Sequence, residues 1–269
     1  MSVPNLTEKE MLLLEKQNSR IVPEFKANKL ELEAQKNWDL FYKRNETNFF
    51  KDRHWTTREF EELLGEVDSD IKAGDADQPK VLLEVGCGVG NLVFPLLEEK
   101  LPLYIYCCDF SPRGVQFVKD HDLYDEKRVK AFQCDITTDT LLTELGEDSV
   151  NMITCIFVMS AIHPDKHQKV FNNLSKVLKP GGVLCFRDYG LYDMAMIRFK
   201  PGSKIADNFY TRQDGTRSYF FQAEEIARLG EEAGLDPYQA QCVPRRTVNM
   251  KEGVDVARNF VQAKFRKPL

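Results

Sequence analysis

The chain has 269 residues, of which 42% are hydrophobic and 29% charged, so it can bury a core and is not disordered as a whole. Its longest apolar stretch, Met152 to Ile162, is interrupted by Thr154 and Ser160 and is shorter than the roughly 20 residues that cross a bilayer, which excludes a membrane protein. The net charge of −5 by itself argues against a nucleic-acid partner, but residues 181–269 carry 14 Lys and Arg against 11 Asp and Glu, and a locally basic face can still bind phosphate.

The N-terminal part of the chain predicts a helical segment followed by a linker. Apolar residues recur there at spacings of three and four, as on one face of an amphipathic helix: Leu30, Ala34, Trp38, Phe41 and Tyr42. The stretch Glu66–Gln78 is rich in acids and small residues and precedes Pro79, a pattern typical of a flexible linker. We therefore expect a helical extension over residues 1–65, an acidic linker over 66–79 and a main domain over 80–269.

From residue 80 onward, short apolar runs alternate with helical stretches. The expected strands are Val81–Val85, Leu103–Cys108, Val129–Cys134, Val150–Val158 and Val183–Arg187. The expected helices between them are Leu92–Glu99, Pro112–Lys119, Leu141–Leu145 and Lys166–Leu178. This alternation predicts an α/β fold with a mostly parallel sheet and helices on both faces. Such sheets bind ligands where the carboxyl ends of their strands meet, so the chemistry is expected directly after each strand.

Glycines follow the first expected strand. The run is Glu84-Val85-Gly86-Cys87-Gly88-Val89-Gly90-Asn91, and glycine lets a backbone approach a ligand without contact from a Cβ. A dinucleotide fingerprint would need a third glycine where Asn91 stands, whereas G-x-G-x-G after an acid resembles the first motif of Rossmann-like S-adenosylmethionine (SAM) methyltransferases. A tight turn also explains glycines, but Glu84 on a buried strand is a costly charge unless something compensates it. We assign Glu84, Gly86 and Gly88 to the cofactor site.

Acids also follow the second and third expected strands. Asp109 stands close to the roughly 20-residue spacing of ribose-binding acids after a glycine loop, although an Asx-type turn explains it equally well by itself. At Asp135 a carboxylate can accept a hydrogen bond from an adenine amino group, and the neighbouring Ile136 can pack on the ring. Phe110, next to the ribose acid, joins the predicted cofactor site. With the glycine loop and the late turn Pro180-Gly181-Gly182, these features together predict a SAM-binding domain.

A closer resemblance covers the chain from about Leu30 to its C-terminus. Its motifs are NWDLFYKRN at 37–45, NFFKDRHW at 48–55, RDYG at 187–190, RF at 198–199, NFY at 208–210, DGT at 214–216 and YFF at 219–221. These motifs resemble those of the tRNA N3-methylcytidine methyltransferases, and Lys51–Glu62 is most similar to the branch that acts on serine tRNAs. The resemblance implies the Rossmann-like fold of class I SAM-dependent methyltransferases, with an N-terminal helical extension.

The resemblance implies SAM as the cofactor and places an aromatic lid over it. The lid residues are Trp38 and Tyr42, although two aromatics four residues apart are by themselves more typical of core packing. The same resemblance places further residues at the cofactor: Gly86, Asp109, Asp135, Ile136 and Ile156. One departure from the pattern is Pro95 within the helix after the glycine loop, where we expect a bend rather than a lost site.

Basic residues interleaved with aromatics suit contact with RNA phosphates and bases. The predicted RNA contacts are Arg44, Lys51, Arg53, His54, Tyr192, Arg198, Phe199, Arg212 and Arg217. They lie in the N-terminal block or in residues 189–222, which we expect to form a substrate-facing insertion. The alternative interpretation is that the stems of long basic side chains merely cover apolar surface.

Methyl transfer to N3 of cytosine requires little acid–base chemistry from the protein. The neutral base already carries a lone pair there, so methyl transfer needs alignment and exclusion of water rather than a general base. Because the methylated base is a cation, a carboxylate near the ring would stabilise the transition state. We predict this catalytic role for Asp188, with Tyr189 stacking on the base. The alternative is a structural role for Asp188, either as a cap or as the ion-pair partner of Arg187 or Arg198.

The cysteines and histidines indicate a reducing compartment and no metal site. Seven cysteines are an odd number with no CxxC pair, and most stand inside apolar runs, where a reduced thiol behaves as a small hydrophobe. His163 and His167 are interpreted as surface histidines. Acids near the N-terminus and the lack of a small-residue cleavage site argue against a targeting peptide. We expect a cytoplasmic protein, with the nucleus as the alternative.

The resemblance therefore implies an enzyme that forms N3-methylcytidine in the anticodon loop of a tRNA, with serine tRNA as the expected substrate. The resemblance also implies dependence on a prior modification of the tRNA or on a partner such as seryl-tRNA synthetase, and the modest basic surface agrees with this. The rival functions are a SAM-dependent methyltransferase with a protein or small-molecule target, and a non-catalytic RNA-binding scaffold. The Arg-rich segment 187–217 argues against the first rival, and the intact cofactor motifs argue against the second.

Overall fold

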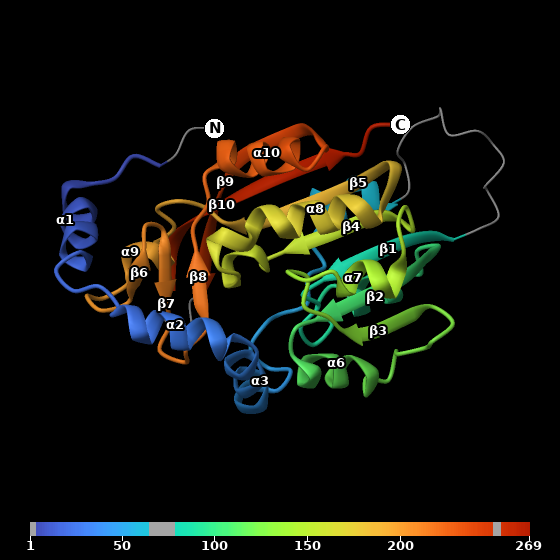
Figure 1. Cartoon of the computed structure of the whole chain (residues 1–269), viewed down its shortest axis with the longest axis horizontal. Helices are drawn as coiled ribbons and strands as arrows, with labels where there is room; N and C mark the ends of the chain where they lie inside the picture. Colours follow the sequence, from blue (N-terminus) through green and yellow to red (C-terminus); the bar gives the residue numbers. More distant parts are fainter. Residues whose placement is uncertain (1–3, 65–78, 250–253) are drawn as a thin grey trace.

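Seven strands form one sheet through the middle of the molecule (Figure 1). The computed structural model describes residues 4–64, 79–249 and 254–269. Its sheet has the order β3-β2-β1-β4-β5-β10-β9. The strands are β1 (Lys80–Val85), β2 (Leu103–Asp109), β3 (Val129–Gln133), β4 (Val150–Ile156), β5 (Leu178–Tyr189), β9 (Asp236–Asn249) and β10 (Val254–Arg266). Strands β1 to β5 pair in parallel, which confirms the expected mostly parallel sheet.

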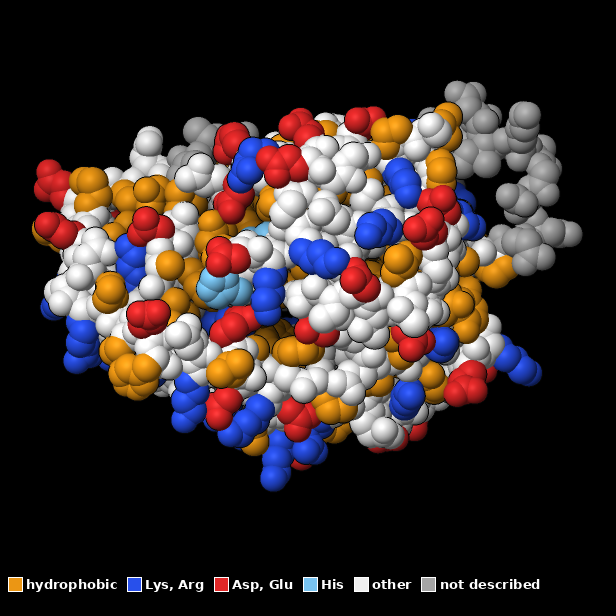
Figure 2. All heavy atoms as spheres, viewed as in Figure 1, with side chains coloured by type: hydrophobic (Ala, Val, Ile, Leu, Met, Phe, Trp, Pro, Cys, Tyr) orange, Lys and Arg blue, Asp and Glu red, His pale blue; other side chains and the backbone are white. Residues whose placement is uncertain are grey.

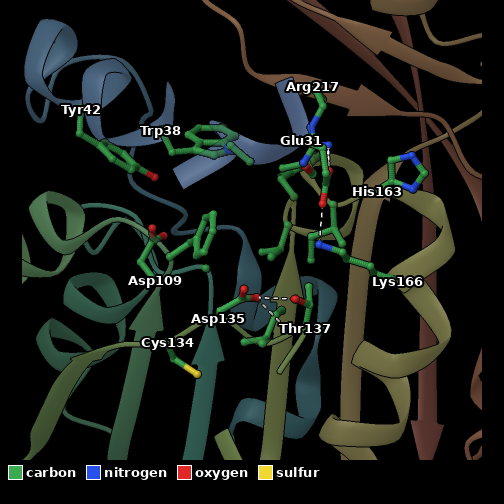
Figure 3. A pocket seen from close by; sticks show the side chains of 18 residues that line it. Glu31, Trp38, Tyr42, Asp109, Cys134, Asp135, Thr137, His163, Lys166 and Arg217 are labelled. Carbon is green, nitrogen blue, oxygen red and sulfur yellow. Dashed lines mark hydrogen bonds and ion pairs between the residues drawn. The ribbon is translucent and has the colours of Figure 1, made fainter. Parts of the chain in front are cut away.

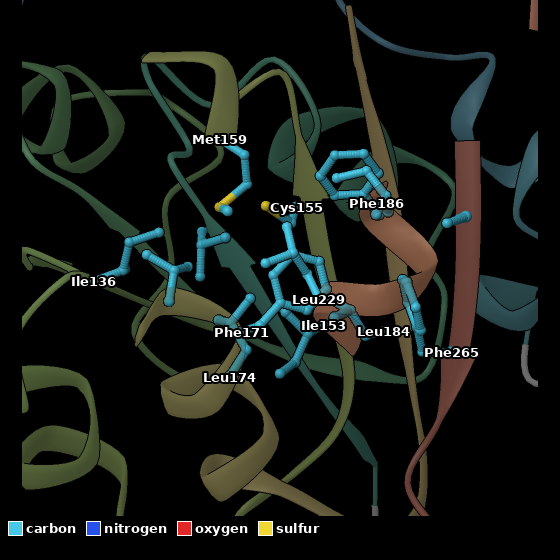
Figure 4. Packing of buried hydrophobic residues seen from close by; sticks show 14 of the residues in the cluster. Ile136, Ile153, Cys155, Met159, Phe171, Leu174, Leu184, Phe186, Leu229 and Phe265 are labelled. Carbon is cyan, nitrogen blue, oxygen red and sulfur yellow. The ribbon is translucent and has the colours of Figure 1, made fainter. Parts of the chain in front are cut away.

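Helices cover both faces of this sheet because each presents an apolar stripe to it. On one face lie α7 (Thr140–Leu145), α8 (His167–Val177) and α10 (Ala223–Glu232), and on the other lie α5 (Val93–Glu98) and α6 (Pro112–Lys119). Figure 4 shows Phe171 and Leu174 of α8 and Leu229 of α10 packed against side chains of the central strands. This packing fixes the carboxyl ends of the strands as a rigid edge on which a site can be built.

The N-terminal extension is a series of short helices. They are α1 (Glu8–Gln17), α2 (Glu24–Leu32), α3 (Ala34–Asn45), α4 (Thr56–Glu59) and the 3₁₀ turn η1 (Glu61–Leu64). Helix α3 lies at the edge formed by the carboxyl ends of the strands, whereas Phe60 and Leu63 pack on the sheet face that α5 and α6 cover. The expected single apolar face from Leu30 to Tyr42 is divided between two helices, because the backbone leaves helical geometry at Glu33. Asp39 of α3 accepts hydrogen bonds from the Ser111 hydroxyl (3.0 Å) and the Arg113 backbone N–H (3.2 Å), which fixes α3 to the start of α6.

A small second sheet lies between β5 and α10, within the expected insertion. It consists of β6 (Lys204–Ala206), β7 (Phe209–Thr211) and β8 (Arg217–Tyr219), and α9 (Met194–Ile197) precedes it. The short turns η2 (Met159–Ala161) and η3 (Pro164–Lys166) connect β4 to α8. The Gln17 side chain of α1 donates to the carbonyl of Met196 at 2.9 Å, so the extension also contacts this insertion.

The main sheet has two strands that the sequence interpretation did not predict. Strand β10 pairs antiparallel with β5, and β9 pairs antiparallel with β10. The expected linker over residues 66–79 lies, apart from its last residue, outside the described residues. No helix among the described residues is long and apolar enough to span a membrane.

Candidate active site

A first cavity of about 130 Å³ opens at the carboxyl ends of β1 to β4, where the strand order reverses (Figure 3). Its lining combines acids, aromatics and small residues: Glu31, Ala34, Trp38, Tyr42, Gly86, Asp109, Phe110, Cys134, Asp135, Ile136, Thr137, Phe157, Val158, Ala161, Ile162, His163, Lys166 and Arg217. Seven of the predicted cofactor residues are brought together in this lining. They are Trp38, Tyr42, Gly86, Asp109, Phe110, Asp135 and Ile136.

The glycine loop after β1 has a conformation that only glycine adopts easily. Gly86 and Gly88 have φ angles of +63° and +57°, in the left-handed region that Cβ-bearing residues rarely occupy. A Cβ on Gly86 would lie 2.5 Å from a methyl carbon of Val158, and one on Gly88 would lie 2.9 Å from the Tyr42 hydroxyl. The loop therefore needs glycine both for its turn and for the close approach of the lid.

Asp109 connects this loop to the start of α6. Its carboxylate accepts hydrogen bonds from the backbone N–H of Gly88 at 2.9 Å and of Ser111 at 2.8 Å. Burial raises the pKa of Asp109 to about 6, and these hydrogen bonds limit the rise. A carboxylate held in this way has remaining lone pairs that can accept hydrogen bonds from two neighbouring hydroxyl groups.

The far wall of the cavity follows β3. One oxygen of Asp135 accepts from the backbone N–H and the hydroxyl of Thr137, at 2.9 and 2.7 Å (Figure 3). Ile136 is 6% exposed and packs in the core. Asp109 and Asp135 line the same cavity as the apolar Phe110 and Ile136, a combination of groups that suits a purine nucleoside.

Two aromatic rings of α3 cover the cavity from above (Figure 3). The centroids of the Trp38 and Tyr42 rings are 6.0 Å apart. Burial, with a further contribution from the Asp109 carboxylate, raises the pKa of Tyr42, so its phenol stays neutral. The rings thus form an apolar cover that excludes water from the ends of the strands.

A second cavity, of about 240 Å³, adjoins the first. It shares Trp38, Tyr42, Gly86, Phe157 and Ala161 with the first cavity. Its other lining residues are Phe41, Phe49, Phe50, Arg53, Cys87, Gly88, Asn91, Ser160, Tyr189, Ala195, Arg212 and Asp214. Aromatic faces and guanidinium groups in one hollow suit a planar, uncharged heterocycle attached to a phosphate chain. Because the two cavities share lining residues, ligands bound in them would lie next to each other, as a reaction between the ligands requires.

Phe157 marks the boundary between the cavities. It directly follows β4 and has a φ angle of +59°, an uncommon conformation for a bulky residue that occurs mostly at functional sites. This is why β4 ends at Ile156 rather than at Val158 as expected from the sequence. The Phe157 backbone N–H donates to the carbonyl of Arg187 at 2.7 Å, which keeps the turn joined to β5.

Asp188 lies beside the second cavity and is completely buried. Its carboxylate accepts from the backbone N–H of Ser160 at 2.9 Å and from that of Tyr189 at 2.8 Å. Burial raises the pKa of Asp188 to about 6, although these hydrogen bonds oppose the rise. Ser160 and Tyr189 line the cavity. The Asp188 carboxylate is hydrogen-bonded to the backbone of both residues and therefore lies directly behind the cavity wall.

Neither Arg187 nor Arg198 forms the ion pair with Asp188 that one alternative role requires, whereas its backbone hydrogen bonds also fit the role of a cap. The Arg187 guanidinium lies over the Trp55 ring (4.5 Å) and within 3.6 Å of the Glu59 carboxylate. It also donates to the Gln262 side chain at 3.2 Å. Arg198 is exposed. The carboxylate of Asp188 is satisfied by backbone donors instead.

Two predicted cofactor residues take supporting positions. Glu84 and Ile156 are 2% exposed at the carboxyl ends of β1 and β4. The Arg53 guanidinium lies 4.0 Å from the Glu84 carboxylate and donates to the Ile156 carbonyl at 3.2 Å. Burial raises the pKa of Glu84 to about 8, and the charge of Arg53 opposes that rise.

The predicted RNA contacts separate into three groups. Arg53 and Arg212 line the second cavity, beside Tyr189. The exposed group consists of Arg44, Lys51, His54 and Arg198. The third group is internal: Tyr192 and Phe199 pack in a cluster with Tyr210, and the Phe199 ring stacks on that of Tyr210 with centroids 4.7 Å apart.

Arg217 and His167 differ most from the sequence interpretation. Arg217 is 5% exposed and binds Glu31 in the wall of the first cavity, so its guanidinium is not presented to RNA. His167 is 2% exposed rather than at the surface. Its Nε2 is 3.1 Å from the Met159 carbonyl oxygen, and burial lowers its pKa to about 4. The neutral ring therefore fixes the turn after β4.

Sequence reasoning missed several residues of the site. Ser160 could have been found, because it closely follows an expected strand. Glu31 and Lys166 carry no local pattern and reach the cavity only through tertiary packing. All seven cysteines are buried. No group of three or more His, Cys, Asp or Glu side chains that could hold a metal ion occurs within residues 4–64, 79–249 and 254–269.

Comparison with known proteins places this geometry among methyltransferases. Residues 83–184 match a family described as a methyltransferase domain. The chain is 58% identical over 262 residues to the tRNA N(3)-cytidine methyltransferase METTL6 of Mus musculus, which covers 97% of this chain and 90% of that relative. It is 46% identical over 247 residues to the tRNA N(3)-methylcytidine methyltransferase trm141 of Schizosaccharomyces pombe, covering 91% and 96% of the two chains.

Solved structures with low sequence identity share the fold. A methyltransferase in complex with the Haloferax volcanii Trm112 methyltransferase activator superimposes with a TM-score of 0.60 at 15% identity, covering 88% of this chain and 98% of that chain. The Burkholderia thailandensis 1,6-didemethyltoxoflavin-N1-methyltransferase, with bound S-adenosylhomocysteine, has a TM-score of 0.52 at 15% identity and covers 100% and 94%. At such identities the likeness concerns the fold alone.

Proposed function

The chain belongs to the tRNA N(3)-cytidine methyltransferases and uses S-adenosylmethionine, and we propose which of its residues serve the reaction and which tRNA is its substrate. The target is a cytidine in the anticodon loop of serine tRNA. The observation that carries the assignment of residues is the wall shared by the two cavities, formed by Trp38, Tyr42, Gly86, Phe157 and Ala161. A nucleoside-type pocket and an aromatic, arginine-lined pocket meet there.

The first cavity offers two hydrogen-bond acceptors and an apolar side chain that suit SAM. Asp109 would accept hydrogen bonds from the ribose hydroxyls, and Asp135 from the adenine amino group, with Ile136 against the ring. SAM supplies an electrophilic methyl group when it is bound. Glu84 and Asp109 are buried acids whose ionised forms a neighbouring positive charge would favour. The cationic cofactor therefore suits this end of the sheet.

The second cavity would bind and orient the cytosine. Tyr189 is flanked by two guanidinium groups, Arg212 at 5.6 Å and Arg258 at 5.7 Å from its ring centroid. Both contacts fix the ring as a platform for a planar base. Because N3 of cytosine needs no deprotonation, the residues of this cavity contribute alignment and exclusion of water. The Asp188 charge behind Ser160 and Tyr189 would stabilise the cation that develops on the base.

A separate protein is proposed to strengthen the hold on the tRNA. The chain carries a net charge of −5, so the molecule as a whole is not attracted to RNA, and its affinity depends on a small number of local phosphate contacts. A tRNA-binding partner such as seryl-tRNA synthetase would supply the missing phosphate contacts and the choice of serine tRNA. The cytoplasm, where tRNA is charged, is the proposed compartment.

Nucleoside analysis of individual tRNAs tests the proposal. Purified enzyme, SAM and a serine tRNA transcript should yield 3-methylcytidine, and a transcript whose anticodon-loop cytidines are replaced by uridine should not. The same enzyme carrying Asp109→Ala is the control for a contaminating activity. Serine tRNA from cells that lack the protein should have lost the modified nucleoside. Loss from another tRNA alone would contradict the serine assignment, and an unchanged nucleoside profile would contradict an RNA substrate.

A further inference from the structure

Glu31 joins three separate elements at the mouth of the first cavity (Figure 3). It lies on α2, and its Oε1 accepts a hydrogen bond from the Lys166 ammonium of η3 at 2.5 Å. Its Oε2 accepts a hydrogen bond from the Arg217 guanidinium of β8. One carboxylate thus connects the N-terminal extension to the turn after β4 and to the small second sheet.

The environment makes this contact stronger than an ordinary surface ion pair. The Arg217 side chain is 5% exposed and that of Glu31 is 27% exposed. Burial by itself would raise the pKa of Glu31, but hydrogen bonds from Lys166 and Arg217 outweigh burial and hold the pKa below its usual value. Arg217 also donates to the Ala161 carbonyl at 3.3 Å. Charge-assisted hydrogen bonds in such a partly dry site are stronger than exposed ones.

A second contact, farther along the N-terminal extension, also joins it to the small second sheet. The Asn37 side chain of α3 is 9% exposed and donates to the Gly215 carbonyl at 3.1 Å. Gly215 lies in the turn between β7 and β8. The extension is therefore attached to this hairpin at Glu31 and at Asn37, on either side of Glu33, where α2 passes into α3.

The hairpin that holds the extension also holds a residue of the second cavity. The Arg212 guanidinium donates to the Arg217 carbonyl (3.5 Å) and to the Ser218 hydroxyl (3.1 Å). Arg217 thus contacts Glu31 through its side chain and Arg212 through its backbone. A shift of β8 would change the first cavity and the second cavity together.

These contacts matter because α3 carries the rings that cover both cavities. Trp38 and Tyr42 line each cavity, so a ligand in either cavity contacts this cover, and movement of the cover would change how fast the ligand leaves. Lids of this kind commonly set the rates of ligand exchange.

We propose that Glu31 is a positioning residue whose ion pairs with Lys166 and Arg217 hold the α2–α3 cover closed over the cofactor and, through β8, couple cofactor binding to RNA binding. The closure depends only on the cofactor site, whereas the coupling rests on the proposed function.

Release of S-adenosylhomocysteine measures the closure directly. In a Trp55→Phe background, Trp38 is the remaining tryptophan of the chain, and its fluorescence reports the cover in stopped-flow displacement. Glu31→Gln should release the ligand about tenfold faster, the effect of losing one charge-assisted hydrogen bond. The matched control is Glu33→Gln, which makes the same change at a residue paired with the exposed Lys36, and it should release the ligand at the wild-type rate.

Lys166→Met provides a second variant at a half-exposed side chain. It should give a smaller acceleration, because Arg217 still holds Glu31, and it should add nothing further when combined with Glu31→Gln. Equal release rates in Glu31→Gln and Glu33→Gln would overturn the closure. Additive effects of the two substitutions would show that Lys166 acts independently of Glu31 and would also overturn it.

The coupling is measured as the change in tRNA affinity when S-adenosylhomocysteine is added. Wild-type enzyme and Glu33→Gln should bind serine tRNA more tightly with the ligand than without it, and Glu31→Gln should lose most of that difference. An unchanged difference in Glu31→Gln would overturn the coupling. If the wild-type enzyme neither binds nor methylates tRNA, the proposed function fails, while the release rates still decide whether Glu31 closes the cover.

Discussion

Three carboxyl groups at the ends of the central strands share one physical feature. Burial raises the pKa of Glu84 to about 8 and those of Asp109 and Asp188 to about 6. A buried carboxylate is costly unless a positive charge compensates it. The reaction brings two such charges, the sulfonium of the cofactor and the cationic methylated base. Arg53 compensates part of this cost at Glu84, and a bound cationic ligand would favour the ionised forms of all three acids.

Replacing Asp188 by Asn should separate catalysis from cofactor binding. The substitution keeps the shape of the side chain but removes its charge, so SAM affinity should persist while the single-turnover rate falls roughly 10²-fold. The wild-type rate at saturating SAM should also fall as the pH is lowered through about 6, because protonation removes the same charge. Asp188→Asn should have a flat profile in that window.

The measurements for this variant are SAM affinity by calorimetry, melting temperature and single-turnover rate between pH 5 and pH 8. The two carboxylate oxygens of Asp188 accept separately from the Ser160 and Tyr189 N–H groups, so Asn keeps an acceptor for only one of them and the melting temperature should fall as well. A normal rate in Asp188→Asn would remove this residue from the catalytic group and leave alignment by Tyr189 as the main contribution. A loss of SAM affinity equal to the loss of rate would indicate that the charge serves the cofactor instead.

At the scale of elements, the glycine loop and α3 form one contact surface. Gly88→Ala should weaken SAM binding for two reasons: a φ of +57° costs about 1–2 kcal/mol for alanine, and the new Cβ meets the Tyr42 hydroxyl at 2.9 Å. Adding Tyr42→Phe should restore part of the affinity, since the ring carbon Cζ is 3.7 Å away. The loss of thermal stability should remain. Calorimetry and thermal melting measure the two effects.

A matched control isolates the contact from the backbone strain. Gly146 has a φ of +81°, and a Cβ built there meets no atom within 4 Å. Gly146→Ala should therefore lower the melting temperature without changing SAM affinity. If Gly88→Ala binds SAM as well as Gly146→Ala does, the loop and the cover are not in functional contact.

The same scale shows which elements a sequence can reveal. The first five strands follow from apolar runs between helical stretches, and the acids Asp109 and Asp135 follow from the rule that ligands meet the ends of such strands. Strands β9 and β10 were missed, although Val261, Ala263 and Phe265 alternate along β10 with the period of a half-buried strand.

Other parts of the site leave no local pattern. Glu31 looks like any acid on a polar helix, and its role depends on Lys166 and Arg217, which are more than a hundred residues away in sequence. A basic residue in an Arg-rich segment gives no sign that its guanidinium is buried, as that of Arg217 is. Tertiary packing decides such cases, so they could not be predicted from periodicity or spacing.

At the scale of the whole molecule, charge is distributed unevenly around the site. In Figure 2, Lys and Arg side chains gather along the edge occupied by α2 and α3, while the rest of that face mixes both signs. Arg44 and Lys51 are exposed near this edge, on the segment that also supplies Phe49 and Phe50 to the second cavity. A base that enters this cavity would bring its neighbouring phosphates toward these two side chains.

Substituting Arg44 or Lys51 by Ala should therefore weaken tRNA binding without changing SAM affinity. Each phosphate contact releases roughly 0.7–0.9 of a counterion, so each substitution should reduce the slope of log affinity against log salt concentration by about that amount. Lys127→Ala is the control, because Lys127 is exposed in the loop before β3, at the amino end of the sheet, and should leave the slope unchanged. Fluorescence anisotropy with labelled tRNA from 50 to 200 mM salt measures this slope.

Equal slopes for all three variants would mean that the RNA backbone does not approach over α3, and the exposed Arg198 would then be the next phosphate contact to test.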